Sequence, residues 1–180
     1  DEALFISTEE MAHSLIAAAE RVANDFETGK NNKLVLVTGS NMSGKTTFLR
    51  TLGVNLILAQ SGAPVCAKTF TFSPMEILTS IRVNDSLQEH TSYFMAELQR
   101  LQKIIQRLQN NKPALVLIDE ILRGTNSEDK TYGSEQFILQ LLRYNCITLF
   151  ATHYLTLASL ENAHNGVISN FCFESIIENN

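Results

Sequence analysis

The chain has 180 residues, 44% of them hydrophobic, and a formal net charge of -5. This size and apolar content suit one globular domain with a filled core, so we expect residues 1–180 to form a single domain. The acidic balance excludes a surface that grips nucleic-acid backbones, so any nucleic acid would be bound by segments outside this chain.

Neither a membrane span nor a secretory signal is expected. The longest apolar runs, such as residues 115–118 and 147–151, are far shorter than the about 20 residues that a membrane helix needs. The first residues lack the basic and then apolar order of a signal peptide, so we expect a cytoplasmic protein. The widely spaced Cys66, Cys146 and Cys172 have apolar neighbours, which favours reduced core thiols over a metal site or a disulfide framework.

The first 32 residues are expected to form an N-terminal segment that packs on the rest of the domain. Ser7 and Glu10 match a capping box, and an apolar series at helical spacing follows it. The pattern predicts a helix over residues 8–23 and a polar turn over residues 24–32. The apolar series consists of Met11, Leu15, Ala18 and Val22.

From residue 34 onward, short buried strands alternate with helices. This alternation predicts an α/β fold with a mostly parallel sheet flanked by helices. The expected strands are residues 34–38, 114–118, 146–151 and 167–174, with further strands and loops over 65–83. The expected helices are residues 45–60, about 94–108 and 134–144.

A phosphate-binding loop is predicted between the first buried strand and the helix that follows it. Its glycines allow the backbone to form a nest of N–H groups at a helix N-terminus. Lys45 would reach the β- and γ-phosphates of ATP, and the Thr46 hydroxyl would bind Mg²⁺. The alternative is a Gly-rich turn that binds nothing. The loop is Gly39, Ser40, Asn41, Met42, Ser43, Gly44, Lys45 and Thr46, with Thr47 next in the helix.

Two carboxylates end the next buried strand, about seventy residues after the loop. Asp119 would bind the Mg²⁺, directly or through water, and Glu120 would act as general base on the attacking water. A solvated turn after a strand is the alternative. His153 follows a third buried strand at the same sheet edge and could sense the γ-phosphate, although a lone His is more often structural.

Four segments, in matching order and spacing, resemble the ATPase domain of the MutS family of DNA mismatch repair proteins. The resemblance covers residues 22–174, and an Asn-Met pair inside the P-loop is unusual outside that family. Residues 13–16 also resemble a family segment that is not helical, which conflicts with the helix predicted over 8–23. The four segments are Thr38 to Arg50, Ala59 to Gly62, Asp119 to Thr125 and Phe150 to Tyr154.

The resemblance implies an ABC-type ATPase that works as a homodimer, with each ATP held between the P-loop of one subunit and a loop of the other. Ser92 stands where family members carry the residue that reaches the partner's γ-phosphate. From the sequence pattern alone, Ser92 would be a helix N-cap. Asn126 to Asp129 would form a loop that crosses the dimer interface, and Asn41 would contact the nucleotide of its own subunit.

The implied function is ATP-driven dimer closure coupled to DNA handling, with the DNA held by domains outside this chain. Ser40 and Ser43 stand where mismatch-repair MutS usually has Pro and Gly, which indicates a MutS-related branch. A small-molecule kinase is one alternative, but it needs a lid with arginines, and Arg123 is the arginine that follows the two carboxylates. A non-hydrolytic nucleotide-binding module is the other.

Overall fold

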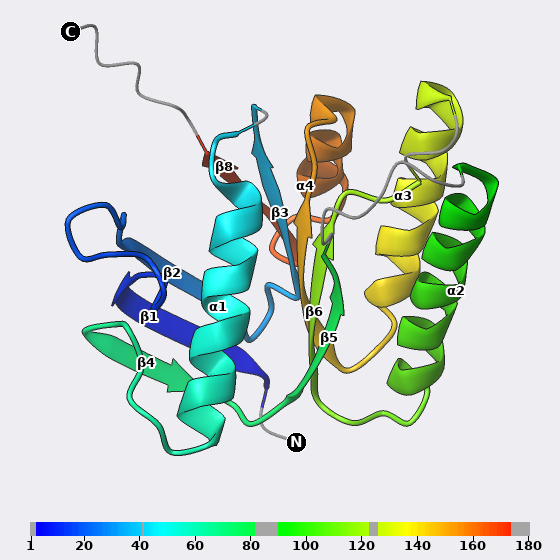
Figure 1. Ribbon diagram of the computed structural model, residues 1–180. Helices are drawn as coiled ribbons and strands as arrows, with labels where there is room; N and C mark the ends of the chain where they lie inside the picture. The colour runs from blue at the N-terminus through cyan, green and yellow to red at the C-terminus, as the bar shows by residue number, and fades with distance from the viewer. Residues whose placement is uncertain (1–2, 41, 82–89, 123–125, 174–180) are drawn as a thin grey trace, which may run out of the picture.

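The computed structural model describes residues 3–40, 42–81, 90–122 and 126–173, and only the backbone of residues 90–93. Its larger sheet has five strands in the order β5-β6-β7-β3-β8, and every pairing is parallel (Figure 1). This arrangement confirms the predicted α/β class. The strands are β3 (Leu34–Gly39), β5 (Glu76–Ser80), β6 (Ala114–Asp119), β7 (Cys146–Ala151) and β8 (Ile168–Phe173).

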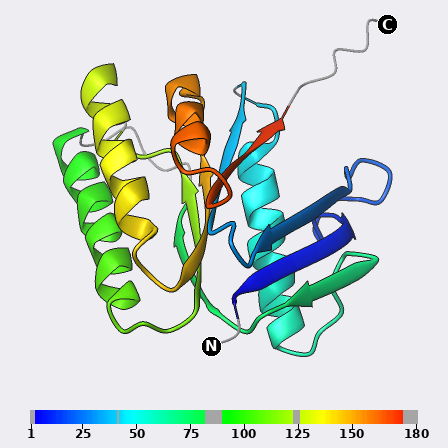
Figure 2. The ribbon, with the colours of Figure 1, turned by 180° about the vertical axis from the view of Figure 1, so that it is seen from behind.

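Helices cover both faces of this sheet. Helix α1 (Lys45–Gln60) lies on one face, and helices α2 and α3 lie side by side on the other (Figures 1 and 2). Side chains from each face form their own hydrophobic cluster with the helices above them. The second face carries α2 (His90–Leu108), α3 (Ser127–Leu141), the short 3-10 helix η1 (Leu155–Ala158) and α4 (Ser159–Ala163).

The central strands are buried on both sides, which explains their continuous apolar sequence. Every residue of β6 and β7 is buried. Alternate residues of β6 enter opposite clusters: Leu115 packs with α1, and Val116 packs with α2 and α3. Gly53 brings α1 close to β6, because a Cβ there would lie 2.9 Å from Cδ1 of Leu117.

A second, antiparallel sheet with strand order β2-β1-β4 lies beside α1 (Figure 1). Ile6, Met11 and Phe26 from this sheet belong to the same buried cluster as α1 and β3. The N-terminal segment therefore packs against α1. The strands are β1 (Phe5–Met11), β2 (Asn24–Gly29) and β4 (Thr69–Phe72).

The predicted helix over residues 8–23 is wrong, as is the polar turn at residues 24–29. Backbone pairing of β1 with both β2 and β4 overrides the capping-box pattern. The helical apolar series has no face to bury, because Leu15 and Val22 are 87% and 77% exposed. Burial instead follows an alternating pattern through Ile6 and Thr8, as expected for a strand.

Two smaller expectations also change. Helix α3 begins seven residues before the predicted residue 134, because the Asn126 side chain caps it by accepting a hydrogen bond from the Asp129 backbone N–H. Of the three cysteines, only Cys146 is buried, while Cys66 is half-buried and Cys172 is exposed. Burial raises the pKa of the Cys146 thiol, so it stays protonated. Within the described residues, no helix has the length and hydropathy needed to cross a membrane.

Asn55 ties the N-terminal segment to the middle of α1. It is fully buried, and its amide donates to the Ala12 carbonyl at 3.0 Å and accepts from the Cys66 backbone N–H at 2.7 Å. Ala12 and Cys66 also pair directly, backbone N–H to carbonyl, at 2.8 Å. One side chain therefore satisfies backbone groups from two loops.

We expect Asn55→Ala to lower the free energy of unfolding by about 2–4 kcal/mol, because the buried Ala12 carbonyl and the partly buried Cys66 N–H lose their side-chain partner. Urea denaturation followed by circular dichroism measures this change. Ile57→Ala is the matched control, since Ile57 is 55% exposed on the same helix and its loss should cost less than about 0.5 kcal/mol. Equal effects of the two substitutions would refute the bridging role.

Candidate nucleotide-binding site

The loop between β3 and α1 requires glycine at both ends. Gly39 and Gly44 have φ angles of 141° and 96°, and Gly44 is the N-cap residue of α1. A Cβ at Gly39 would lie 2.3 Å from the Phe173 carbonyl oxygen, so no larger residue fits where β3 meets β8. Met42 is fully exposed, and Asn41 lies outside the described residues. The loop thus leads a buried strand into a helix N-terminus, the geometry that suits an anion.

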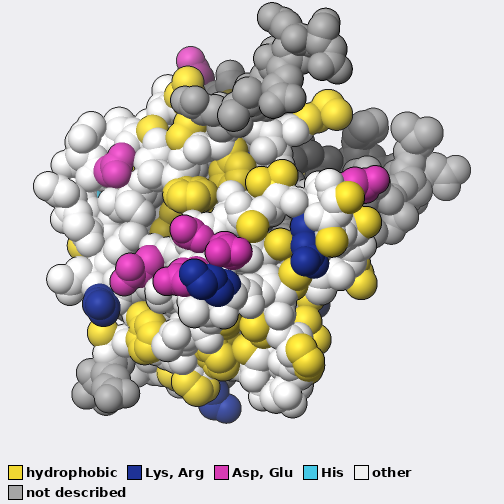
Figure 3. Space-filling view, turned by 90° about the vertical axis from the view of Figure 1, so that its left-hand side faces the viewer, with side chains coloured by type: hydrophobic (Ala, Val, Ile, Leu, Met, Phe, Trp, Pro, Cys, Tyr) yellow, Lys and Arg dark blue, Asp and Glu magenta, His cyan; other side chains and the backbone are white. Residues whose placement is uncertain are grey.

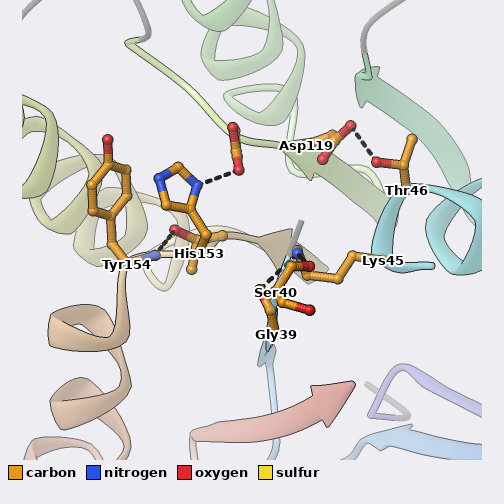
Figure 4. A network of polar contacts seen from close by, with 9 residues as sticks. Gly39, Ser40, Lys45, Thr46, Asp119, His153 and Tyr154 are labelled. Carbon is orange, nitrogen blue, oxygen red and sulfur yellow. Dashed lines mark hydrogen bonds and ion pairs between the residues drawn. The ribbon is translucent and has the colours of Figure 1, made fainter. Parts of the chain in front are cut away.

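Lys45 is folded onto this loop. Its ammonium donates hydrogen bonds to the carbonyl oxygens of Gly39 at 2.8 Å and Ser40 at 2.6 Å (Figure 4). The side chain is only 6% exposed, so these carbonyls replace the water that the charge would otherwise bind. A phosphate group in the loop would compete for the same three donors. The buried cation is therefore placed to meet an anion with little reorganisation.

Thr46 and Asp119 join the loop helix to the end of β6. The Thr46 hydroxyl donates to Oδ2 of Asp119 at 2.8 Å, although 73 residues separate them in sequence (Figure 4). Asp119 is the last residue of β6 and is 6% exposed. Two hard oxygen atoms therefore lie side by side at the mouth of the loop. Among the described residues, no group of three or more His, Cys, Asp or Glu side chains forms a metal site by itself.

Glu120 follows Asp119 in a left-handed conformation, with φ of 45°. Its backbone N–H donates to the Ala151 carbonyl at 3.0 Å, so the chain turns where β6 ends beside β7. The Glu120 carboxylate contacts Nδ1 of His153 at 2.5 Å. The His153 ring packs on Tyr154 with a centroid distance of 4.2 Å. These contacts hold a carboxylate and an imidazole together at the same edge as Lys45.

The structure thus brings most of the proposed site residues to the carboxyl edge of the sheet. They come from the ends of β3, β6 and β7, where ligands of such folds collect. Ser92 lies within the first turn of α2 and so is not its N-cap, and its side chain is outside the described residues. Asn126 to Asp129 form a capped helical turn and not a loop. The residues brought together are Gly39, Ser40, Lys45, Thr46, Asp119, Glu120 and His153.

Sequence reasoning missed one buried acid next to the site. Glu97 of α2 is 7% exposed, and its Oε2 accepts a hydrogen bond from the Leu122 backbone N–H at 3.1 Å. Its position within the apolar stripe from Phe94 to Leu108 is the signal that could have revealed it, because an acid on a buried helix face requires a partner.

Comparisons with known proteins converge on one family. A family model described as MutS domain V matches residues 35–179. The DNA mismatch repair protein MutS of Clostridium kluyveri is 36% identical over 177 residues, which cover 94% of this chain and 20% of that protein. MutS protein homolog 4 of Mus musculus and of Homo sapiens are 35% and 34% identical over 160 residues, which cover 88% of this chain and 16% and 17% of those proteins. The chain therefore spans about a fifth of the length of the Clostridium relative, and less of the other two.

We expect Lys45→Ala to weaken ATP binding by about 100-fold or more, because the loop loses a buried charge that would pair with phosphate. Isothermal titration calorimetry measures this affinity. Lys33→Ala is the matched control, since Lys33 is exposed and precedes the opposite end of β3. An unchanged affinity for ATP in Lys45→Ala would show that the loop is not part of the nucleotide-binding site.

Proposed function

Because the chain belongs to the MutS family and corresponds to its ATPase domain, domain V, we propose that residues 1–180 form one ATPase domain of a longer MutS-like protein. In this proposal, ATP binding closes a homodimer, hydrolysis reopens it, and the cycle moves DNA held by other domains. The Clostridium relative is named a DNA mismatch repair protein, and the proposal extends this DNA-handling role to the protein that contains this chain. Residues 1–32 serve as a segment that packs on α1.

The contact between Thr46 and Asp119 carries this proposal. It joins the phosphate loop to the carboxylate strand, and the Glu120–His153 pair lies directly after the same strand. A loop that only binds nucleotide needs neither a second carboxylate nor a base beside it. The combination of cation, hydroxyl, two carboxylates and imidazole is suited to phosphoryl transfer to water.

The oxygen pair of Thr46 and Asp119 fits a Mg²⁺ ion. Mg²⁺ is usually held by one or two protein oxygens together with phosphate oxygens and water, so a hydroxyl and one carboxylate are a sufficient protein contribution. Their 2.8 Å hydrogen bond would open, and both oxygens would then be ligands. When bound, the ion would neutralise charge on the β- and γ-phosphates.

The remaining residues bind phosphate, orient water and move a proton. Lys45 exchanges its two carbonyl partners for phosphate oxygens, and the backbone N–H groups of the loop between β3 and α1 cradle the phosphates. Glu120 takes a proton from the attacking water as general base. His153 donates from Nδ1 to the Glu120 carboxylate, which fixes the direction of that base and puts the imidazole near the γ-phosphate.

The second subunit would complete the site through Ser92. This residue lies in the first turn of α2, where a helix N-terminus favours an anion. Asn126, which caps α3, lies in the segment that would meet the partner. DNA is bound elsewhere, in keeping with the net charge of -5 and with the acidic side chains that gather around Lys68 beside the three-stranded sheet (Figure 3).

Glu120→Gln should leave the affinity for ATP within about twofold and lower the rate of hydrolysis by about 100- to 10,000-fold, because an amide cannot accept the proton from water. Radiolabelled ATP in single-turnover assays separates the two steps. Sedimentation should then show an ATP-bound dimer that persists. Equal loss of binding and hydrolysis would mean that Glu120 is structural.

In the full-length protein, the ATPase rate per subunit should rise with protein concentration and respond to DNA, because a composite site forms only in the dimer. Steady-state phosphate release across a dilution series measures this. A rate that ignores both concentration and DNA, but rises with a small phosphoryl acceptor, would instead indicate a kinase.

A further inference from the structure

A short segment after β6 decides where Glu120 points. Residues Glu120 and Leu122 both have positive φ angles, 45° and 59°, although neither is glycine. Such conformations persist only where surrounding contacts impose them. The segment therefore holds its shape because neighbouring elements keep it there, and each of those contacts bears on the base that would activate water.

Three elements hold this segment in place. The Glu120 N–H bonds to Ala151 of β7, and Ile121 is buried in the core beneath α2 and α3. The Leu122 side chain lies against α3 so closely that a Cβ at Gly133 would come within 2.4 Å of its Cδ1. The fourth contact comes from α2, where the Glu97 carboxylate accepts the Leu122 N–H at 3.1 Å.

The α2 contact differs from the others in strength and in origin. A buried carboxylate that accepts a backbone N–H makes a charge-assisted hydrogen bond, which is stronger than a bond between neutral groups. Glu97 is 7% exposed, so water competes little for its oxygens. It also lies five residues after Ser92 on the same helix, a rise of about 7.5 Å, so the two residues move together with α2.

We propose that Glu97 is a positioning residue for hydrolysis, whose carboxylate fixes the Leu122 backbone, aims Glu120, and couples that aim to the helix that carries Ser92. This inference rests on the proposed function, in which Glu120 is the base and Ser92 meets the partner's nucleotide. A shift of α2 when Ser92 engages the partner's γ-phosphate is passed through Glu97 to the base of its own subunit. The two ATP sites of a dimer are thereby linked through one side chain.

Three substitutions at residue 97 in the full-length protein separate the effect of side-chain length from the effect of the carboxylate charge. Glu97→Gln keeps an acceptor oxygen at the same distance and loses the charge, whereas Glu97→Asp keeps the charge but is one methylene too short. Glu97→Ala loses both. Misplacement of a catalytic group by about 1 Å can cost about 100-fold in rate, so we expect Glu97→Ala and Glu97→Asp to lower kcat by about 10- to 100-fold.

The affinity for ATP should stay within about twofold in all three variants, since the P-loop is untouched, and Glu97→Gln should keep kcat within about threefold of the parent. Leu108→Ala is the structural control, because Leu108 is buried at the far end of α2 and its loss should lower Tm with kcat preserved. If Glu97→Ala does not fold, the kcat values of Glu97→Asp and Glu97→Gln still test the proposal.

Parent-like kcat in Glu97→Asp overturns the proposal, as does a Glu97→Gln variant as slow as Glu97→Asp. A loss of kcat in Leu108→Ala that matches its loss of stability also overturns it, since the effect would then be general. Glu120→Gln is measured in the same series. If the parent hydrolyses no ATP, the proposed function fails. If Glu120→Gln turns over ATP normally, Glu120 is not the base, and this inference fails with that role. If Glu120→Gln stalls while Glu97→Asp is normal, only the role of Glu97 fails.

Discussion

The parallel pairing of β7 with both β3 and β6 is the constraint on which the site depends. Ala151 is opposite Val37 on one side and Asp119 on the other, so the phosphate loop and the carboxylates are held at a fixed offset across one strand. Two strand spacings amount to roughly 10 Å, a separation that side chains from both edges can bridge. Burial of all residues in β6 and β7 makes this register expensive to change.

Buried charges and strained backbone conformations lie next to this rigid sheet. Lys45 and Asp119 are charged and nearly buried, and Glu120 and Leu122 adopt left-handed conformations that cost roughly 1–3 kcal/mol each. A sequence under pressure for stability alone would avoid all four features. Their presence at one edge, above two well-packed clusters, is the pattern expected where local rules are broken for function.

The sequence predicted the elements whose signals are local and missed those that depend on distant partners. Buried strands such as β3, and the glycine-flanked loop ending at Lys45, follow from apolar runs and backbone conformation, and both were right. Residues 8–23 failed because the helical spacing was coincidental, while pairing with β2 and β4 lies outside any local window. Glu97 was missed for a related reason, since its partner Leu122 lies 25 residues away on another element.

If each ATP site is shared by two subunits, nucleotide binding in one subunit must be able to change the structure of the site in the other. Long-range electrostatics would be a weak route, because salt screens exposed charges beyond about 8–10 Å. A packed helix with a buried hydrogen bond to the segment that carries the base is a better one, since well-packed interiors transmit displacement. Helix α2 has this form, with Ser92 in its first turn and Glu97 just beyond it against the Leu122 backbone. In the proposed dimer, the same short stretch of helix would serve both ATP sites, and hydrolysis in one subunit would be sensitive to nucleotide in the other.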